Sequence, residues 1–492
     1  MASASGRHGE SYILHILVSP LPFLRMGTRK DDKMINIGVD QDSNSISKNT
    51  ENFTDCCDSS RSPYYAYSNL DSLQTTTRQL RNFLFVNPSE FVEGQIETMG
   101  NPKGVIFGIL CLFSSFFGTL VFFPPLLIMS FLDPRIGRKA LDFMIWLWVV
   151  YCVALYENFC GVKIIISGEP APEEDGTLIV MNHRTRFDWM FLYSYQMRCS
   201  SLSRLKISLK KSLKAIPGVG WAMQVGGFLF LDRKWESDKH TIAKGIRYFG
   251  LLKQKPQILL FPEGTNMSKH TKQRSDNFAE TNGLEKYDYV LHPKTKVISK
   301  VTENCTHVMY LGKLPNFYKM LDIMTKSCVF STDDCLDSVT DITIGYTKNI
   351  PENESDILRG DFPKEIHFLA KRHRERDLPT NSEDLEKWCK SLWKKKEQTL
   401  KEFYEKNTFG EGVKNGLQKD ENRVQHLFRF ATMFWTLFMM AVCWMLYYHP
   451  LFRWYSLILG VFFASISRYG GVDNLLFNSV DKLSVTLGYY QT

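Results

Sequence analysis

Long uncharged apolar runs lie near both ends of this chain, and shorter apolar runs lie between them. Residues 105–132 contain no charged side chain. At about 1.5 Å per helical residue, this run is long enough to cross a hydrocarbon layer of about 30 Å. Residues 143–156 form a second run of fourteen apolar and aromatic residues, which predicts a tilted or interfacial helix. Together the two runs predict a membrane helical hairpin over residues 101–160.

Basic residues separate the two runs of the hairpin. Arg135, Arg138 and Lys139 are expected in its short loop, and Pro124-Pro125 is expected to kink the first helix. The positive-inside rule places a basic loop in the cytosol. Whether the hairpin spans the membrane or re-enters it on one side stays open at this point.

Two further runs predict a C-terminal membrane anchor over residues 426–470, followed by a tail over residues 471–492. Residues 430–448 are nineteen consecutive uncharged residues, and residues 454–467 form a shorter run. Aromatic-rich helices buried inside a soluble domain are the alternative. Four such runs on both sides of one domain favour a membrane protein.

Between these runs, strand-like segments alternate with helix-like ones, which is the pattern of an α/β domain. We assign this domain to residues 161–375. Residues 236–253 are predicted to form a helix. Five short runs are predicted to form strands: 162–167, 177–181, 257–261, 341–347 and 365–372. Residues 381–405 predict a charged helix with a solvated face, within a charged helical linker region over residues 376–425.

The first hundred residues differ from the rest in composition. They hold nine basic and twelve acidic residues, a net charge of −3, so the remainder holds +11 of the chain's total of +8. Residues 27–82 are rich in Ser, Thr, Asn and Asp, and we predict a disordered N-terminal extension over residues 1–100. The basic remainder suits anionic lipid headgroups, and no nucleic-acid-binding motif is visible. Eleven cysteines without metal-ligand spacing predict a reducing compartment and no metal site.

Two polar motifs follow two of the predicted strands. The first, NHRTRFD at residues 182–188, places His183 five positions before Asp188. Five residues turn about 140° around an α-helix, so the two side chains cannot share one helical face. They can meet if His183 lies in a loop and Asp188 in the first turn of the next helix. A carboxylate bonded to one ring nitrogen then fixes the tautomer and leaves the other nitrogen as a general base.

A lone histidine at a strand end is more often a structural hydrogen-bonding group than a catalytic one. The second motif favours the catalytic interpretation here. Glu263-Gly264-Thr265 follows the strand predicted over residues 257–261, and Pro262 ends strand pairing because it has no N–H to donate. Polar clusters at the ends of two buried strands are the usual arrangement of an α/β active site. Neither motif offers a Ser or Cys nucleophile, and no G-x-S-x-G elbow is visible, which argues against a Ser-His-Asp hydrolase.

These residues resemble the lysophospholipid (1-acylglycerol-3-phosphate) acyltransferase superfamily. His-x4-Asp and Glu-Gly-Thr stand in the family's order, and residues 217–224, 228–235 and 278–284 make the match closest to the lysocardiolipin acyltransferase branch. The resemblance extends from about Met99 to about Arg468. It implies a glycerolipid acyltransferase-type mixed sheet flanked by helices, with the N-terminal hairpin and the C-terminal helices in a membrane.

The resemblance also implies a reaction. A fatty acyl group would move from acyl-CoA, a co-substrate, to a free hydroxyl of a lysophospholipid such as lysocardiolipin, without a cofactor. His183 and Asp188 would be the catalytic residues, and Arg233 would bind the acceptor phosphate. The headgroup of the acceptor would be held by Asn182, Glu263, Gly264 and Thr265. The family implies the endoplasmic reticulum membrane, including its mitochondria-associated parts, as the location.

Several alternatives stay open. Many family members carry a basic residue where this chain has Asn266, which weakens lysophosphatidic acid as the acceptor. The motifs nevertheless leave a 1-acylglycerol-3-phosphate or a lysophosphatidylinositol acceptor possible, and Arg233 could form a surface ion pair instead. An inactive membrane scaffold that retained the fold is the alternative from another class, and the intact His183, Asp188 and Glu263 argue against it. Residues 296–338 match the family poorly and are interpreted as an insertion.

Overall fold

The computed structural model describes residues 101–232, 235–294, 336–379, 382–410 and 419–486. These residues belong to one compact unit of the chain. The extension over residues 1–100, Arg233 and most of the predicted insertion lie outside the described residues.

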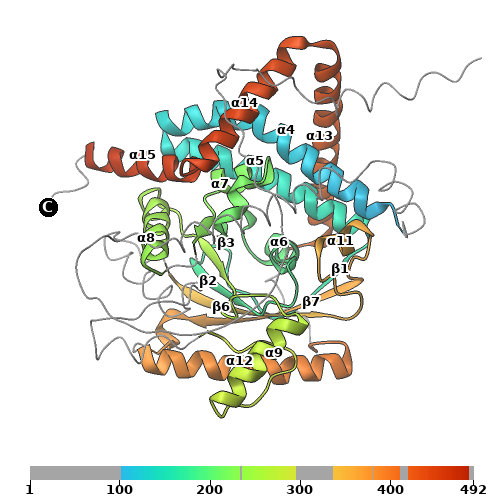
Figure 1. The fold of residues 1–492 in the computed structure, drawn as a ribbon, viewed down its shortest axis with the longest axis vertical. Coiled ribbons are helices and arrows are strands. Elements are labelled where there is room, and N and C mark those ends of the chain that lie inside the picture. Colours follow the sequence, from blue (N-terminus) through green and yellow to red (C-terminus); the bar gives the residue numbers. More distant parts are fainter. Residues whose placement is uncertain (1–100, 233–234, 295–335, 380–381, 411–418, 487–492) are drawn as a thin grey trace, which may run out of the picture. The chain divides into compact units, whose positions relative to one another are not determined.

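A seven-stranded mixed sheet forms the centre of this unit (Figure 1). Its strands are β1 (Lys163–Glu169), β2 (Thr177–Met181), β3 (Leu205–Lys210), β4 (Leu229–Leu231), β5 (Gln257–Leu260), β6 (Ser338–Tyr346) and β7 (Glu365–Arg374). They lie in the order β1-β7-β6-β2-β5-β3-β4. Strands β2 to β6 run parallel, β7 is antiparallel to β6, and β1 is parallel to β7. The carboxyl ends of β2, β5 and β6 therefore meet at one edge, the carboxyl edge, and their starts meet at the amino edge.

Helices cover both faces of the sheet (Figure 1). The α-helices are α4 (Lys103–Leu132), α5 (Pro134–Ala154), α6 (Asp188–Cys199), α7 (Val219–Val225), α8 (Trp235–Leu251), α9 (Lys269–Thr281), α11 (Glu354–Leu358), α12 (Ser382–Lys406), α13 (Glu421–Tyr448), α14 (Pro450–Arg468) and α15 (Val472–Thr486). Short 3-10 turns stand at Leu202–Arg204, Lys211–Ala215 and Glu375–Asp377. The α/β domain that the sequence pattern predicts is confirmed, and so is the mixed sheet with flanking helices that the family resemblance implies.

Strand β2 shows why apolar runs mark this sheet. All five of its residues are buried. Leu178 and Val180 pack in one apolar cluster with α8 and α12, whereas Ile179 and Met181 pack in another with α5 and α6. Successive side chains of a strand point to opposite faces, so a continuous apolar run suits a strand that helices cover on both sides.

Helix α12 differs from the expectation of a solvated helix in a linker. It covers one face of the sheet, where Leu385, Trp393 and Phe403 are buried beside residues of β2 and β5 (Figure 1). Lys396 is buried on the same side and forms an ion pair with Asp341 of β6. Because charged residues crowd the outer face of α12, its composition concealed an amphipathic helix.

The N-terminal hairpin consists of α4 and α5, which are joined by one residue. The basic residues expected in a loop lie inside α5, so that expectation was wrong. The physical reason is a strong helix start: the Asp133 carboxylate accepts from the first backbone N–H groups of α5, and Pro134 presets the helical φ. Arg138 is fully buried and donates to Asp142 at 2.8 Å and to the Val225 carbonyl at 2.6 Å. A buried arginine in a helix carries no positive-inside signal.

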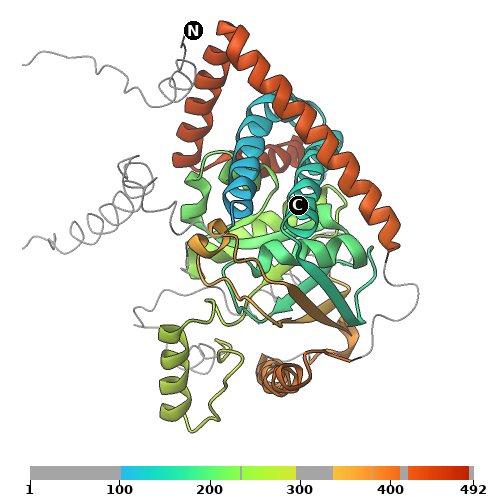
Figure 2. The ribbon, with the colours of Figure 1, turned by 90° about the vertical axis from the view of Figure 1, so that its right-hand side faces the viewer.

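Among the described residues, four helices are long and apolar enough to cross a membrane: α4, α5 with its extension to Phe159, α13 and α14. They differ in how much protein covers them. In the most apolar stretch of α5, 61% of the residues are buried, against 6% in α14. Figure 2 shows α13 and α14, in orange and red, meeting at one turn. Their large exposed apolar side chains, such as Leu437 and Ile458, support membrane association.

The predicted C-terminal tail begins with a helix, α15. The buried ion pair of Lys214 with Asp473, at 2.6 Å, fixes its start, and the Gln224 side chain accepts from the Val472 N–H. Phe477 then packs on Tyr248 of α8, with 4.9 Å between ring centroids. The chain after the membrane helices therefore returns to the α/β domain.

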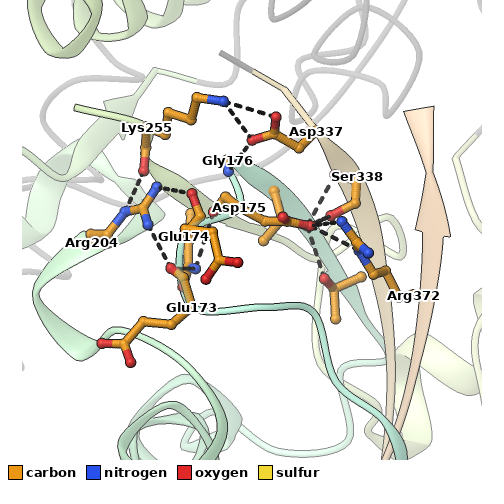
Figure 3. Close-up of polar contacts among 12 residues, drawn as sticks. Glu173, Glu174, Asp175, Gly176, Arg204, Lys255, Asp337, Ser338 and Arg372 are labelled. Carbon is orange, nitrogen blue, oxygen red and sulfur yellow. Dashed lines mark hydrogen bonds and ion pairs between the residues drawn. The ribbon is translucent and has the colours of Figure 1, made fainter. Parts of the chain in front are cut away.

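Polar residues close the amino edge of the sheet (Figure 3). The Asp175 carboxylate accepts from the Ser338 hydroxyl at 2.8 Å and from the guanidinium of Arg372 at 2.6 Å. Lys255 forms an ion pair with Asp337 at 2.8 Å. Arg204 donates to three backbone carbonyls, those of Glu173, Glu174 and Lys255. These contacts hold the loops that lead into β2, β3, β5 and β6.

Candidate active site

His183 and Asp188 meet as the sequence predicts. His183 lies in the loop after β2, and Asp188 is the first residue of α6. The distance from His183 Nδ1 to Asp188 Oδ2 is 2.9 Å. The Asp188 side chain is fully buried, whereas 16% of the His183 side chain is exposed. The pair thus has a buried orienting carboxylate and an imidazole that solvent or a substrate can reach.

The surroundings of Asp188 hold its carboxylate in one orientation. Oδ2 accepts from the Thr185 N–H at 2.9 Å, and Oδ1 accepts from the Thr185 hydroxyl at 3.3 Å and from the Tyr346 hydroxyl at 2.5 Å. Burial and the adjacent carboxylate raise the pKa of Tyr346 well above its ordinary value of 10, so Tyr346 remains a donor. An ionised carboxylate only accepts hydrogen bonds, and these donors match it.

Tyr346 was not among the residues predicted for the site, although its position at the end of a predicted strand could have indicated it. Tyr346 ends β6, a predicted strand, and β6 is parallel to β2. Because the carboxyl ends of parallel strands meet at one edge, a polar residue at the end of β6 is expected near the residues that follow β2 and β5.

The imidazole of His183 is held in the plane that its hydrogen bond requires. It stacks on the Phe261 ring, with 3.9 Å between centroids and 20° between planes. The His183 carbonyl accepts from the Met267 N–H at 2.9 Å. Nε2 faces away from Asp188 and has no hydrogen-bond partner in the described part of the chain. This nitrogen is therefore the one available to accept a proton.

Glu263 lies beside this loop and is almost completely buried. Its Oε1 accepts from the His183 N–H and from the indole N–H of Trp393, each at 3.3 Å. Oε2 is buried without a hydrogen bond of normal geometry to any described residue, although the nearby Leu291 N–H favours the charged form. Burial outweighs these donors and raises the pKa of Glu263 to about 8. At neutral pH this carboxyl group is therefore mostly uncharged.

The other predicted site residues have different positions. Gly264 has φ +73°, a conformation that favours glycine, and Thr265 beside it is partly exposed. Asn182 is buried, donates to the Ile344 carbonyl at 3.1 Å and accepts from the Ile344 N–H at 2.8 Å. Its amide joins β2 to β6, so both of its polar groups are already bonded within the sheet, and the predicted headgroup contact of Asn182 stays a prediction. Arg233 lies outside the described residues.

Trp393 is a second residue that the sequence did not indicate. It comes from α12, whose charged composition was interpreted as a solvated face. Its indole is fully buried and reaches Glu263 across the sheet face. The amphipathic spacing of α12 was the signal that could have shown that this side points inwards.

Comparison with known proteins finds relatives over most of this chain. A model of the Acyltransferase family matches residues 163–304, and a model of the acyltransferase C-terminus matches residues 356–442. Lysocardiolipin acyltransferase 1 of Mus musculus is 40% identical over 375 residues, which are 75% of this chain and 93% of that protein. The chain belongs to the lysophospholipid acyltransferase family.

Other relatives differ in the acceptor that their names give. Lysocardiolipin acyltransferase 1 of Danio rerio is 36% identical to this chain, and the alignment covers 76% of this chain and 94% of that protein. Lysophosphatidylinositol acyltransferase 10 of Caenorhabditis elegans is 34% identical to this chain, and the alignment covers 76% of this chain and 92% of that protein. The acyltransferase assignment made from the motifs is confirmed. The C-terminal family match includes α12, which covers the sheet.

Proposed function

We propose that this enzyme transfers a fatty acyl group from acyl-CoA to a free hydroxyl of a lysophospholipid, with lysocardiolipin as the main acceptor. One observation carries the reaction type. His183 has one ring nitrogen bonded to a buried carboxylate and the other without a partner in the described residues, at the end of a buried strand. The names of the two lysocardiolipin acyltransferase relatives support the acceptor.

The chemistry proceeds without an acyl-enzyme. Nε2 of His183 takes the proton of the acceptor hydroxyl while its oxygen attacks the thioester carbonyl carbon. The C–S bond then breaks, and the CoA sulfur takes the proton back from the imidazolium. The products are a phospholipid ester and free CoA. Asp188 stabilises the imidazolium and holds the tautomer, and such a base contributes about 10²- to 10⁴-fold in rate.

The acceptor headgroup lies against the second motif in this proposal. An uncharged Glu263 does not repel an anionic phosphate, and Gly264 allows the backbone to approach it closely. Thr265, which is partly exposed, supplies a hydroxyl, and Arg233 supplies the cationic fork that suits a phosphate.

The location follows from the apolar helices and the substrate. Lysophospholipids partition into bilayers, and the four apolar helices of the described residues support a membrane location. We assign that membrane to the endoplasmic reticulum, including its mitochondria-associated parts, as the family resemblance implies. Microscopy of the tagged full chain against marker proteins checks this assignment.

The decisive experiment measures acyl transfer. Membranes that contain the full chain receive labelled oleoyl-CoA and a panel of lysocardiolipin, lysophosphatidylinositol and lysophosphatidic acid. We expect incorporation to be highest with lysocardiolipin and to be lost in His183→Ala at equal protein amount. Equal incorporation by His183→Ala would refute the mechanism. A lysophosphatidylinositol preference, which the relative in Caenorhabditis elegans suggests, would change the acceptor and leave the mechanism intact.

A further inference from the structure

A cavity of about 530 Å³ lies between α5, the start of α13 and the loops that lead into the sheet. Its volume falls within the range of small-molecule pockets, about 300–1,000 Å³. Basic and apolar side chains line it together, and six of them define its chemistry: Lys139, Lys419, Arg423, Phe143, Trp146 and Leu427.

The cavity is separate from the candidate active site. Its walls include Glu173, Ser201 and Gln254, which precede β2, β3 and β5. They therefore lie at the amino edge, where Figure 3 shows Glu173 with its carboxylate directed away from the closed network. His183 and Glu263 lie at the carboxyl edge. The five residues of β2, at about 3.3 Å each, separate the two edges.

The acidic residues of the cavity are already neutralised. Asp142 contacts the guanidinium of Arg138 at 2.8 Å and the ammonium of Lys206 at 3.1 Å. Glu173 contacts Lys419 at 3.1 Å. Neither carboxylate would repel an anion as a free charge does.

Two cations at the cavity remain without such compensation. Lys139 and Arg423 are exposed, and neither has an ion-pair partner within the described ranges. Lys139 lies in the second turn of α5 and Arg423 in the first turn of α13, two of the helices that are apolar enough to cross a membrane. Cations at the ends of such helices lie level with lipid headgroups. A phosphate matches the guanidinium fork and balances the charge.

Apolar side chains line the part of the cavity next to these cations. The rings of Phe143 and Trp146 stack with 5.6 Å between centroids, and 53% of Phe143 is exposed. Leu427, one turn beyond Arg423, forms the facing wall. A cationic rim that leads to exposed apolar surface suits an amphiphile, because a free anion would leave that surface uncovered.

We propose that this cavity binds an intact anionic phospholipid of the surrounding bilayer. The phosphate lies at Lys139 and Arg423, and the acyl chains leave along Phe143, Trp146 and Leu427. This lipid is distinct from the lysophospholipid acceptor. The proposal does not depend on the reaction proposed above, because no residue of the cavity belongs to the candidate active site.

Photocrosslinking tests the proposal on the full chain in phosphatidylcholine nanodiscs. The probe is phosphatidylglycerol with a photoreactive acyl chain, and labelled peptides are mapped after illumination. We expect labels around Phe143 and Leu427. Each removed cation, in Lys139→Gln or Arg423→Gln, should lower this labelling about fivefold, as expected for one charge at an anionic lipid. Acyl transfer and the thermal midpoint should stay unchanged, which shows that the variants fold.

A matched control removes two cations elsewhere. Lys395→Gln with Lys401→Gln changes two exposed residues of α12 and should leave the labelling as it is. The proposal is overturned if Lys139→Gln with Arg423→Gln labels like the wild type, or if the control loses as much. It is also overturned if photoreactive phosphatidylcholine labels the same peptides equally. A last arm adds inorganic phosphate and compares it with chloride of equal ionic strength. If phosphate abolishes the labelling and chloride does not, the cavity is assigned to free phosphate and the lipid proposal is overturned.

Discussion

The two edges of the central sheet both carry polar clusters, but they differ in how completely their groups are satisfied. At the amino edge, Asp175 accepts from Ser338 and Arg372, and three carbonyls satisfy Arg204 (Figure 3). At the carboxyl edge, Nε2 of His183 and Oε2 of Glu263 lack a normal hydrogen bond among the described residues.

This difference separates stability from chemistry. A closed network has no group left to take a proton or to bind a ligand. A general base needs one nitrogen that nothing else occupies, and the orienting contacts must be made by its other nitrogen. The same strands β2, β5 and β6 thus hold a structural cluster at their starts and a reactive one at their ends.

The largest effect is expected from breaking the reactive pair. His183→Ala should lower kcat/KM about 10²- to 10⁴-fold, because the base is lost. Asp188→Asn should lower it by a similar factor, since an amide no longer stabilises the imidazolium. The double variant should lose little more than either single one, because the two residues act as a unit. Losses that multiply in the double variant would contradict this.

Breaking the amino edge should affect stability alone. Asp175→Ala leaves Arg372 without its carboxylate and should cost roughly 2–4 kcal/mol, below the full value for a buried pair because Arg372 is partly exposed. Denaturant unfolding in detergent measures this, and kcat per folded molecule should not change. A loss of kcat with unchanged stability would show that the amino edge takes part in the reaction.

Tyr346→Phe removes one donor from Asp188 and little volume. A hydrogen bond to a charged group contributes about 1.5–3 kcal/mol, so we expect kcat/KM to fall by roughly 10- to 100-fold, because the carboxylate that orients His183 is held less firmly. An unchanged kcat/KM would show that this donor does not help to orient Asp188.

The smallest effect concerns Glu263, whose pKa burial raises to about 8 from an ordinary value of 4.5. Between these pH values the folded state keeps a proton that the unfolded state releases, so stability falls as pH rises through this window and levels off above pH 8. Glu263→Gln lacks this proton. Its thermal midpoint should therefore fall less than that of the wild type between pH 5.5 and 8.5, and parallel curves would contradict the raised pKa.

Much of this architecture could be predicted from the sequence. The buried strands appear as apolar runs because both of their faces are covered, and the His183–Asp188 contact joins residues five positions apart, which meet once a loop is followed by a helix. Tyr346 could not be assigned in this way, since it reaches Asp188 across 158 residues of chain. Trp393 could not be predicted for a related reason, because its partner Glu263 lies far away in the sequence, after another strand.

Residue type and short spacing were enough to predict the apolar helices, the order of the motifs and the family. Which charges are buried, and which groups lack a partner among the described residues, depends on the folded arrangement of distant segments. Arg138 and Lys396 look like surface residues in the sequence and are buried in the fold. The physical reason is that strand register and helix docking bring distant residues together, and a group's protonation and reactivity depend on those neighbours.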